Sequence, residues 1–207
     1  NQLAVPFRFT PEVILQCALN PRWALTSLKH GTPNVANYAD LLQSATSYAD
    51  VQKTLITPGF TWEDLKKLRE RWKGKLLVKG ILHAQDALAC VELGCDGIVV
   101  SNHGGRQVAF GPPTIEALPA IAEAVAGRMT IVLDSGIRRG ADILRAKALG
   151  ADFAFAGRAF AYGVGAGGGA GAQRAFEILQ LELVRALGQL GIPSYNAVGR
   201  SELSTFN

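Results

Sequence analysis

The stretch Gly97-Ile-Val-Val-Ser-Asn-His-Gly-Gly105 decides the fold, because a short apolar run leads directly into polar and glycine residues. Three more runs of this kind occur in the chain, at Leu76–Lys79, Thr130–Leu133 and Phe153–Ala156. Each run precedes a stretch that suits a helix, and these stretches cover residues 84–93, 114–126, 141–149 and 170–190. Continuous apolar runs are typical of parallel strands whose two faces are both covered. The sequence therefore predicts four parallel βα units.

Polar and glycine residues follow the carboxyl end of each predicted strand. Ligands bind at this end in (β/α) barrels and equally in doubly wound sheets. The order of elements therefore leaves both folds open, and the choice between them depends on the motifs at the strand ends.

The composition of the 207-residue chain narrows the class of protein. With 48% hydrophobic and 18% charged residues, the chain is not expected to be disordered, and its length suits one domain or a large piece of a bigger one. No apolar run approaches the roughly 18 residues of a membrane span. Residues 1–11 lack the pattern of a secretory signal, and without an initiator Met the sequence is expected to start inside a longer gene product.

The spacing of cysteines and histidines and the distribution of charge argue against disulfide-rich, metal-binding and nucleic-acid-binding proteins. The cysteines contain no CxxC pair and the histidines no HxxxH pair, so neither a disulfide framework nor a metal site is expected, and a reducing compartment is favoured. The net charge of +4 arises from the first third of the chain. Its densest part, residues 66–75, suits a solvated helix face or, alternatively, a contact with an anionic surface. No stripe of basic residues interleaved with aromatics accompanies it, so nucleic acid is not an expected partner.

Residues 1–59 are predicted to be an irregular segment with short helices, because prolines interrupt it repeatedly. Thr10-Pro11-Glu12 suits a helix start, with Thr10 as the N-cap residue and Pro11 in the first turn. A second helix is expected from Thr61 to about Trp72, at the start of the larger region that covers residues 60–207. The long, weakly periodic connection between Asn20 and Pro58 is of a kind that is usually functional or mobile.

The motif Ser101-Asn-His-Gly-Gly-Arg-Gln107 carries the strongest chemical signal. The end of a predicted strand delivers His103 and, three residues later, Arg106, with two glycines between them. A neutral imidazole can accept a proton near pH 7, and a guanidinium group can hold a carboxylate with two hydrogen bonds. The alternative is a turn with a structurally satisfied histidine. The glycines favour a functional site, because they let the backbone approach a ligand closely.

This motif closely resembles the signature of the FMN-dependent α-hydroxy-acid dehydrogenases and oxidases, a family that includes L-lactate dehydrogenase, mandelate dehydrogenase and glycolate oxidase. The resemblance runs from about Phe60 to Leu203. Three more motifs support it in register: Leu76-Leu-Val-Lys-Gly-Ile81, Leu133-Asp-Ser-Gly-Ile-Arg-Arg-Gly140 and Ala156-Gly-Arg-Ala-Phe160. It implies an α/β fold in which residues 60–207 form the C-terminal half of an FMN-binding (β/α)8 TIM barrel, with four βα units preceded by the irregular segment.

The resemblance also implies a role for each site residue. His103 is the expected catalytic base, and Arg106 is the expected clamp for the substrate carboxylate. Lys79 is the expected contact at the flavin and Asp134 at the ribityl chain, and Ser101 is also expected to touch FMN. The expected contacts around the phosphate are Ser135, Gly136, Ile137, Arg138, Gly157 and Arg158. Taken singly, Lys79 also suits a surface lysine, Asp134 a helix cap, and Arg158 a solvated ion pair.

The function implied is FMN-dependent oxidation of an L-2-hydroxy acid, with L-lactate as the expected substrate, to the 2-keto acid. Electrons would then pass through the flavin to a quinone, a cytochrome or oxygen. The implied partners are the hydroxy acid, an N-terminal barrel half from the same gene or a second chain, and further copies in a homo-oligomer. The expected location is the cytoplasm, or the inner face of the membrane, because residues 20–34 resemble a long loop that contacts the membrane in some members. Alternatively, this segment is a surface excursion whose Trp23 and Leu28 pack on the barrel.

Two departures from the family pattern keep other functions open. Val108-Ala109 follow Gln107, where the family usually continues with Leu-Asp. The missing barrel half normally supplies the aspartate paired with the catalytic histidine, a second substrate arginine and active-site tyrosines. A noncatalytic half-barrel and a flavin-free phosphate-binding barrel subunit are therefore the alternatives.

Gly163–Gly168 matches the GxGxxG pattern, but no acidic residue follows about 20 positions later, so Gly163–Gly171 is predicted to be a glycine-rich loop rather than an NAD site.

Overall fold

The structure, a computed structural model, describes residues 10–31, 59–108 and 110–203. Most of the predicted connection between Asn20 and Pro58 lies outside the described residues, and so does Ala109 in the departure from the family motif. The chain divides into two compact units, Asn1–Thr61 and Trp62–Asn207, and each is described by itself.

Two short helices make up most of the described part of the first unit. Helix α1 (Pro11–Leu19) begins as predicted, because the Thr10 hydroxyl accepts a hydrogen bond from the Val13 amide at 3.3 Å. Helix α2 (Pro21–His30) follows after Asn20 and contacts α1. Across the part of the chain that is described, no helix combines the length and the apolar character that crossing a membrane requires.

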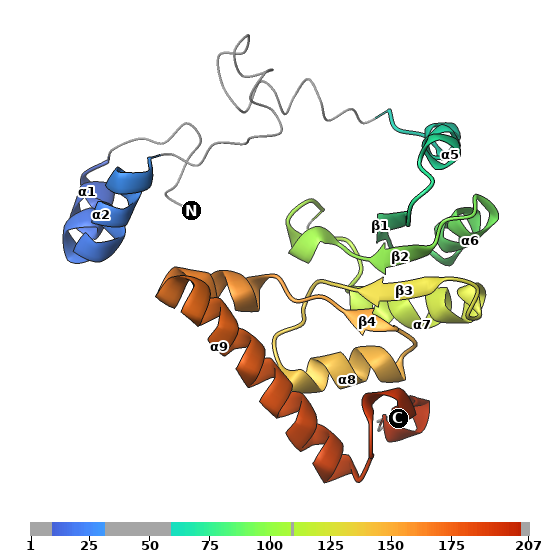
Figure 1. Ribbon diagram of the computed structural model, residues 1–207. Helices are drawn as coiled ribbons and strands as arrows, with labels where there is room; N and C mark the ends of the chain where they lie inside the picture. The colour runs from blue at the N-terminus through green and yellow to red at the C-terminus, as the bar shows by residue number, and fades with distance from the viewer. Residues whose placement is uncertain (1–9, 32–58, 109, 204–207) are drawn as a thin grey trace. The chain divides into compact units, whose positions relative to one another are not determined.

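The second unit is built on a sheet of four parallel strands in the order β1-β2-β3-β4 (Figure 1). The strands are β1 (Leu77–Ile81), β2 (Gly97–Val100), β3 (Thr130–Leu133) and β4 (Phe153–Ala154). This arrangement confirms the prediction of four parallel strands. The register aligns Lys79, Val99, Val132 and Phe153 across the sheet, so this row of side chains shares one face.

A helix follows each strand. These helices are α6 (Ala84–Glu92), α7 (Thr114–Val125), α8 (Gly140–Ala148) and α9 (Arg158–Leu190), while α5 (Trp62–Arg71) precedes β1. Helices α6 and α7 cover the face opposite to the Lys79 row, because Ile98 and Val100 of β2 share a fully buried core with Ala87 of α6 and Leu118 of α7. Helix α9 packs against α8. Short 3-10 turns cover His103–Gly105, Tyr195–Ala197 and Arg200–Glu202.

The loops that enter β2 and β4 are built alike. Each ends with an aspartate, in Leu93-Gly-Cys-Asp96 and in Leu149-Gly-Ala-Asp152. Asp96 Oδ2 accepts a hydrogen bond from the Leu76 amide at 2.9 Å, and Asp152 Oδ2 accepts one from the Ile131 amide at 2.8 Å. In return, each aspartate amide donates to the carbonyl of the same residue, at 2.9 Å and 2.7 Å. These paired hydrogen bonds fix the register of neighbouring strands where the chain enters the sheet.

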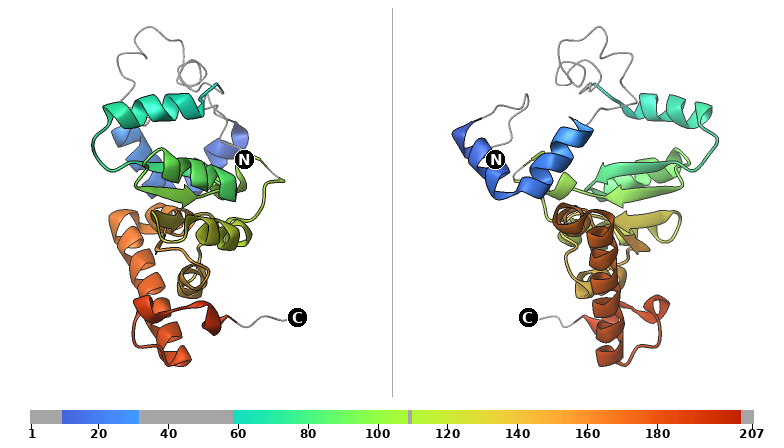
Figure 2. Two further views of the ribbon diagram at one scale, coloured as in Figure 1. Left: turned by 90° about the vertical axis from the view of Figure 1, so that its right-hand side faces the viewer. Right: turned by 60° about the vertical axis from the view of Figure 1, so that its left-hand side comes forward.

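Helix α9 corrects the prediction of a glycine-rich loop at Gly163–Gly171. The helix continues through these residues and breaks only at Gly167 and Gly168, where Figure 1 and Figure 2 show a bend. The glycines are needed because the backbones on either side of the break touch. A Cβ atom on Gly163 would lie 2.4 Å from the carbonyl oxygen of Gly171. They therefore allow two helical segments to pack closely, rather than forming a loose connection.

The acid stability of the protein is expected to depend on Asp96. Hydrogen bonds from Lys75 and the Leu76 amide, with a further one from Arg69, lower the pKa of Asp96 from 3.8 to about 2. Because this pKa is lower in the folded state, the carboxylate stabilises the fold above about pH 3.8, and this contribution is lost as the pH falls towards about 2. Asp96→Asn should lower the free energy of unfolding in urea at neutral pH and flatten its decline across that acid range.

The control for this prediction is Glu92→Gln, which changes an exposed carboxylate on α6 that makes no ion pair with any described residue. This variant should keep the pH dependence of the parent. An Asp96→Asn variant that loses stability in acid as steeply as the parent would contradict the role given to Asp96.

Candidate functional site

A cavity of about 460 Å³ lies at the carboxyl edge of the sheet, lined by Lys79 of β1 and by the segments that follow β2, β3 and β4. This arrangement follows from the fold, because parallel strands all end at the same edge. The structure brings ten of the eleven predicted site residues to this cavity: Lys79, His103, Arg106, Asp134, Ser135, Gly136, Ile137, Arg138, Gly157 and Arg158. The eleventh, Ser101, is buried at 2% exposure and does not line the cavity.

Lys79 and Asp134 form an ion pair that joins the end of β3 to β1. Lys79 Nζ lies 3.2 Å from Asp134 Oδ2 and also donates a hydrogen bond to Ser101 Oγ at 2.8 Å. Ser101 follows β2, the strand between them, and its hydroxyl accepts a hydrogen bond from the His103 amide at 3.1 Å. The cation thus links three neighbouring strand ends and the turn that carries His103.

The carboxyl group of Asp134 is held in its ionised form. Burial alone would raise its pKa, but hydrogen bonds from Ser101, Ser135 and Lys79, with the charge of Lys79, together lower the pKa below its usual value. The Ser135 hydroxyl donates to Asp134 Oδ1 at 2.7 Å. Both carboxylate oxygens are therefore oriented by neighbours before any ligand arrives.

Two residues at this edge adopt left-handed backbone conformations although neither is glycine. The φ angle is 57° at His103 and 71° at Ser135. Such conformations cost energy for residues that carry a Cβ atom, and they cluster at functional sites. Hydrogen bonds offset the cost here: Ser135 Oγ accepts from the Gly104 amide at 2.9 Å, and Asn102 Oδ1 accepts from the Gly105 amide at 3.1 Å.

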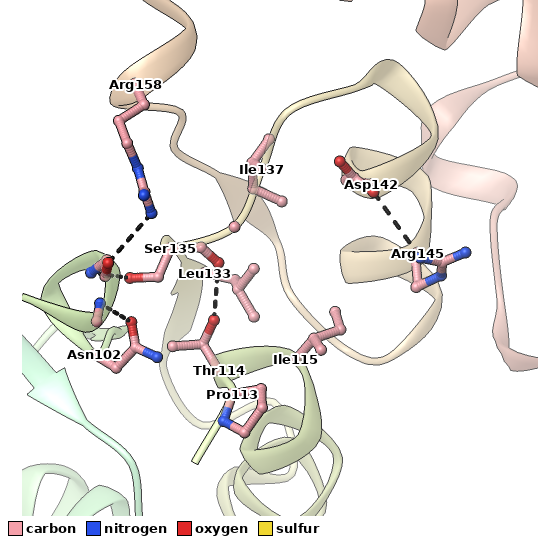
Figure 3. Close-up of a pocket in the computed structure, with 13 residues that line it drawn as sticks. Asn102, Pro113, Thr114, Ile115, Leu133, Ser135, Ile137, Asp142, Arg145 and Arg158 are labelled. Carbon is pink, nitrogen blue, oxygen red and sulfur yellow. Dashed lines mark hydrogen bonds and ion pairs between the residues drawn. The ribbon is translucent and has the colours of Figure 1, made fainter. Parts of the chain in front are cut away.

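Several charged or titratable side chains at the cavity are available to a ligand. Those of His103, Arg106 and Arg138 are exposed and make no hydrogen bond or ion pair with the described residues. Arg158 is partly engaged, because its Nη2 donates to the Gly104 carbonyl at 3.2 Å (Figure 3). An imidazole among guanidinium groups suits an anionic ligand that gives up a proton.

The helix N-termini beside the cavity differ in whether their backbone amides are free to bind a ligand. At the start of α8, the amides of Arg138 and Arg139 donate to Asp142 Oδ2 at 3.0 and 2.9 Å. The Gly140 amide donates to Glu182 Oε2, also at 2.9 Å. Because these carboxylates occupy the donors, the start of α8 offers little to an incoming anion.

At the start of α9 and in the loop after β3, backbone amides remain available as hydrogen-bond donors to a ligand. The amides of Gly136, Ile137, Gly157 and Arg158 find no acceptor in the described ranges of the chain. A Cβ atom on Gly136 or Gly157 would have nothing within 4 Å, so space for a ligand adjoins both glycines. These amides and the Arg158 guanidinium form an anion-binding arrangement typical of a phosphate site at a helix start.

Sequence reasoning did not single out Asn102 and Thr114, which hold the loops of the site. Both line a second cavity of about 370 Å³, which Figure 3 shows. An asparagine two positions before a pair of glycines is a turn signal that could have identified Asn102. Thr114 has no such signal, because its buried hydroxyl donates to the carbonyls of Asp134 at 2.8 Å and Ser135 at 3.0 Å, some twenty residues away in the chain.

Known proteins that are similar to this chain support the family resemblance independently of the site geometry. A family described as FMN-dependent dehydrogenase matches residues 1–205. The chain is 39% identical over 202 residues to (S)-mandelate dehydrogenase of Pseudomonas putida, and 44% identical over 182 residues to L-lactate dehydrogenase of Serratia proteamaculans. These alignments cover 96% and 86% of this chain, but 50% and 48% of the two relatives.

The chain also covers about half the length of the solved structures that it resembles. A crystal structure of the monotopic membrane protein (S)-mandelate dehydrogenase matches with a TM-score of 0.91 at 35% identity, covering 98% of this chain and 54% of that one. A mandelate oxidase variant with a monooxide FMN adduct matches with a TM-score of 0.66 at 40% identity, over 68% of this chain and 45% of that one. The chain spans about half the length of the curated relatives it matches, and the predicted C-terminal half of a (β/α)8 barrel is confirmed.

The ion pair at the cavity predicts a titration that can be measured residue by residue. Lys79→Met removes both a cation and a hydrogen-bond donor from Asp134, so the pKa of Asp134 should rise above its value in the parent protein. Carbon-13 NMR titration of the side-chain carboxyl groups reports this pKa directly.

Lys75→Met is the matched control, because Lys75 pairs with Asp96 at the opposite end of the sheet, with Nζ 2.7 Å from Oδ1. It should raise the pKa of Asp96 and leave the titration of Asp134 unchanged. If the pKa of Asp134 is the same in both variants and in the parent, Lys79 does not lower the pKa of this carboxyl group.

Proposed function

The chain belongs to the FMN-dependent dehydrogenase family, and we propose that it carries half of an active site that oxidises an L-2-hydroxy acid to the 2-keto acid. The observation that carries this proposal is that His103 and Arg106 line the same cavity as the anion-binding amides described above. L-lactate is the substrate we propose first, and (S)-mandelate is the alternative that the relatives' names favour equally.

The residues at the cavity fit FMN. Its phosphate would lie against the free amides of Gly136, Ile137, Gly157 and Arg158, where the glycines leave open space. The guanidinium of Arg158 faces the same cavity and would add a charge-assisted hydrogen bond. Arg138 lines the cavity as well and would add a second positive charge. The amides at the start of α8 would contribute little, since protein carboxylates already occupy them.

The chemistry assigns different roles to the two side chains of the His103 turn. Arg106 would pair with the substrate carboxylate and so orient the α-carbon towards the cofactor. His103 would accept the proton that the substrate gives up during oxidation, a role open to an imidazole that makes no hydrogen bond with the described residues. When bound, FMN supplies the acceptor for the two electrons, which would then pass to a quinone, a cytochrome or oxygen.

Lys79, Ser101, Asp134 and Ser135 would prepare the site for the cofactor. Lys79 places a cation at the cavity, where it would stabilise negative charge that develops on a bound ring system. The ion pair with Asp134, at 3.2 Å, would hold the ammonium group at the cavity. The Asp134 carboxylate, with two oriented oxygens, would accept hydrogen bonds from the hydroxyls of a polyol chain.

The other half of the barrel is a partner that we propose from the sheet itself. In a closed barrel the face that carries the Lys79 row would point inwards, and Leu77 and Phe153 on that face are 41% and 60% exposed. Strands β1 and β4 lie at the two edges and each offers unpaired backbone groups. Four further βα units, from the same gene or a second chain, would cover this face and pair both edges.

A peripheral membrane contact is a further proposal, and it rests on helices α1 and α2. Their exposed apolar side chains include Leu19, Trp23, Leu25 and Leu28, with exposures of 51% to 81%. Lys29 and His30 lie in the last turn of α2, beside this apolar group. The relative of known structure that matches over 98% of the chain is described as a monotopic membrane protein. Co-sedimentation of the protein with anionic lipid vesicles would test the contact, and loss of sedimentation in a Trp23→Ser/Leu28→Ser variant is the expected result.

Separate replacement of His103 and Arg106 tests the proposed function in the assembled enzyme. His103→Gln removes the base but keeps much of the side-chain shape, so bound flavin should remain while its reduction by L-lactate slows by about 100-fold or more. Arg106→Lys keeps the charge but loses the planar pair of donors, so both substrate affinity and reduction rate should fall. Anaerobic stopped-flow absorbance at the flavin band measures both quantities, and (S)-mandelate in parallel decides between the two substrates.

Gln107→Ala is the matched control, because Gln107 directly follows Arg106, is exposed and does not line the cavity. It should leave flavin reduction close to the parent rate. Reduction of the flavin at the parent rate in His103→Gln would place the base elsewhere and overturn the central assignment.

The phosphate site predicts which arginine retains the cofactor. Arg158→Ala should weaken FMN binding by about 10- to 100-fold, the effect of losing a charge-assisted hydrogen bond. Quenching of free FMN fluorescence on titration with apoprotein gives the dissociation constant. Arg174→Ala, which removes an exposed arginine paired with Glu177 farther along α9, is the control and should leave the constant unchanged. Equal affinities in the two variants would remove Arg158 from the phosphate site.

Assembly of the two barrel halves predicts a change in solution behaviour. Alone, the chain should aggregate or form oligomers through its open sheet edges, and co-expression with residues that supply the other four βα units should convert it to a defined species. Size-exclusion chromatography with light scattering measures the change. A chain that remains a cooperatively unfolding monomer by itself would contradict the requirement for a second half.

A further inference from the structure

We infer that Thr114 is a positioning residue for the active site, although its side chain does not line the cavity that holds Lys79, His103 and Arg106. This inference rests on the proposed function, because the groups that Thr114 positions matter through the cofactor and the substrate. Hydrogen bonds connect the Thr114 hydroxyl to the loop after β3, and that loop to the turn that carries His103.

Thr114 is the first residue of α7 and is only 2% exposed. A hydroxyl at a helix start usually caps the helix, but no side chain caps α7, whose N-cap residue is Pro113. Instead, Thr114 Oγ1 donates out of the helix to two successive carbonyls. One is that of Asp134, at 2.8 Å. The other is that of Ser135, at 3.0 Å (Figure 3). The hydroxyl therefore serves the loop after β3 rather than its own helix.

The loop that Thr114 holds is the one that needs support. Ser135 has a φ angle of 71°, a conformation that costs energy for a residue with a Cβ atom. A donor shared between the Asp134 and Ser135 carbonyls fixes the peptide planes on both sides of the Ser135 Cα atom. It stabilises the left-handed conformation from the side of α7, where Thr114 is 2% exposed.

Held in this way, Ser135 connects two parts of the site. Its Oγ donates to Asp134 Oδ1 at 2.7 Å and accepts from the Gly104 amide at 2.9 Å. Gly104 follows His103 directly, and His103 has a φ angle of 57°. Thr114 therefore sets the Ser135 hydroxyl, and that hydroxyl sets the Asp134 carboxylate and the turn that carries His103.

FMN affinity of the apoprotein tests the inference without relying on turnover. Thr114→Val keeps the size and branching of the side chain but leaves two carbonyls without their buried donor, so the FMN dissociation constant should rise about tenfold. Thr114→Ser keeps the hydroxyl and should stay within about twofold of the parent. Thr130→Val makes the same change at the opposite end of β3, where the side chain makes no hydrogen bond with described residues, and it should leave FMN affinity unchanged. The experiment uses the assembled barrel.

A merely structural role is excluded by combining Thr114→Val with Ser135→Ala. If Thr114 acts through the Ser135 hydroxyl, its loss should cost much less once that hydroxyl is absent, and the double variant should bind FMN within about threefold of Ser135→Ala alone. Urea unfolding of the apoproteins reports stability separately. If Thr114→Val does not fold, Thr114→Cys, which has a similar size to serine but donates weakly, replaces it with the same expected result.

The outcomes separate this inference from the proposed function. A parent protein that does not bind FMN overturns the proposed function itself. A parent that binds FMN, with Thr114→Val equal to it in affinity, overturns only the role of Thr114. Additive losses in the double variant, or a Thr114→Ser variant as weak as Thr114→Val, also overturn it, because neither fits a hydroxyl that acts through Ser135.

Discussion

The ion pair between Lys79 and Asp134 is the interaction on which the carboxyl edge of the sheet depends. It spans from β1 to the end of β3, across the strand between them, and Ser101 at the end of that strand shares the ammonium group at 2.8 Å. Side chains that are 22 and 55 positions away from Lys79 in the sequence thereby become one charged unit. The pair also determines the chemistry, because it leaves a positive charge at the cavity and keeps a carboxylate ionised beside it.

Strained backbone beside this pair is stabilised from two sides. His103 and Ser135 both adopt left-handed conformations, and the Gly104 amide joins them through the Ser135 hydroxyl at 2.9 Å. The buried hydroxyl of Thr114 supports the loop from behind the cavity. A sheet edge held in this way loses little conformational freedom when it binds a ligand, so more of the interaction energy appears as affinity.

The fold could be predicted from the sequence to a large extent, because a βα unit is a local pattern. The predicted strand Gly97–Val100 agrees with β2 residue for residue, since its apolar run is bounded by glycine and serine. The glycine-rich start of α9 was predicted wrongly, because glycine in a sequence does not distinguish a loop from two backbones in contact. Thr114 could not be found at all, since its hydrogen-bond partners belong to another βα unit. Motif residues were accessible to sequence reasoning, whereas the residues that support them were not.

The matching loops before β2 and β4 have a consequence for how such a barrel can be divided. In each loop, Asp96 or Asp152 exchanges two hydrogen bonds with the start of the adjacent strand, and the two partners lie 20 or 21 positions apart. The alignment of β1 with β2, and of β3 with β4, is therefore encoded within a single supersecondary segment and needs no information from the far side of the ring. A polypeptide that carries one arc of the ring could therefore align these strands before it meets the rest of the ring, so half of a barrel can carry its own register.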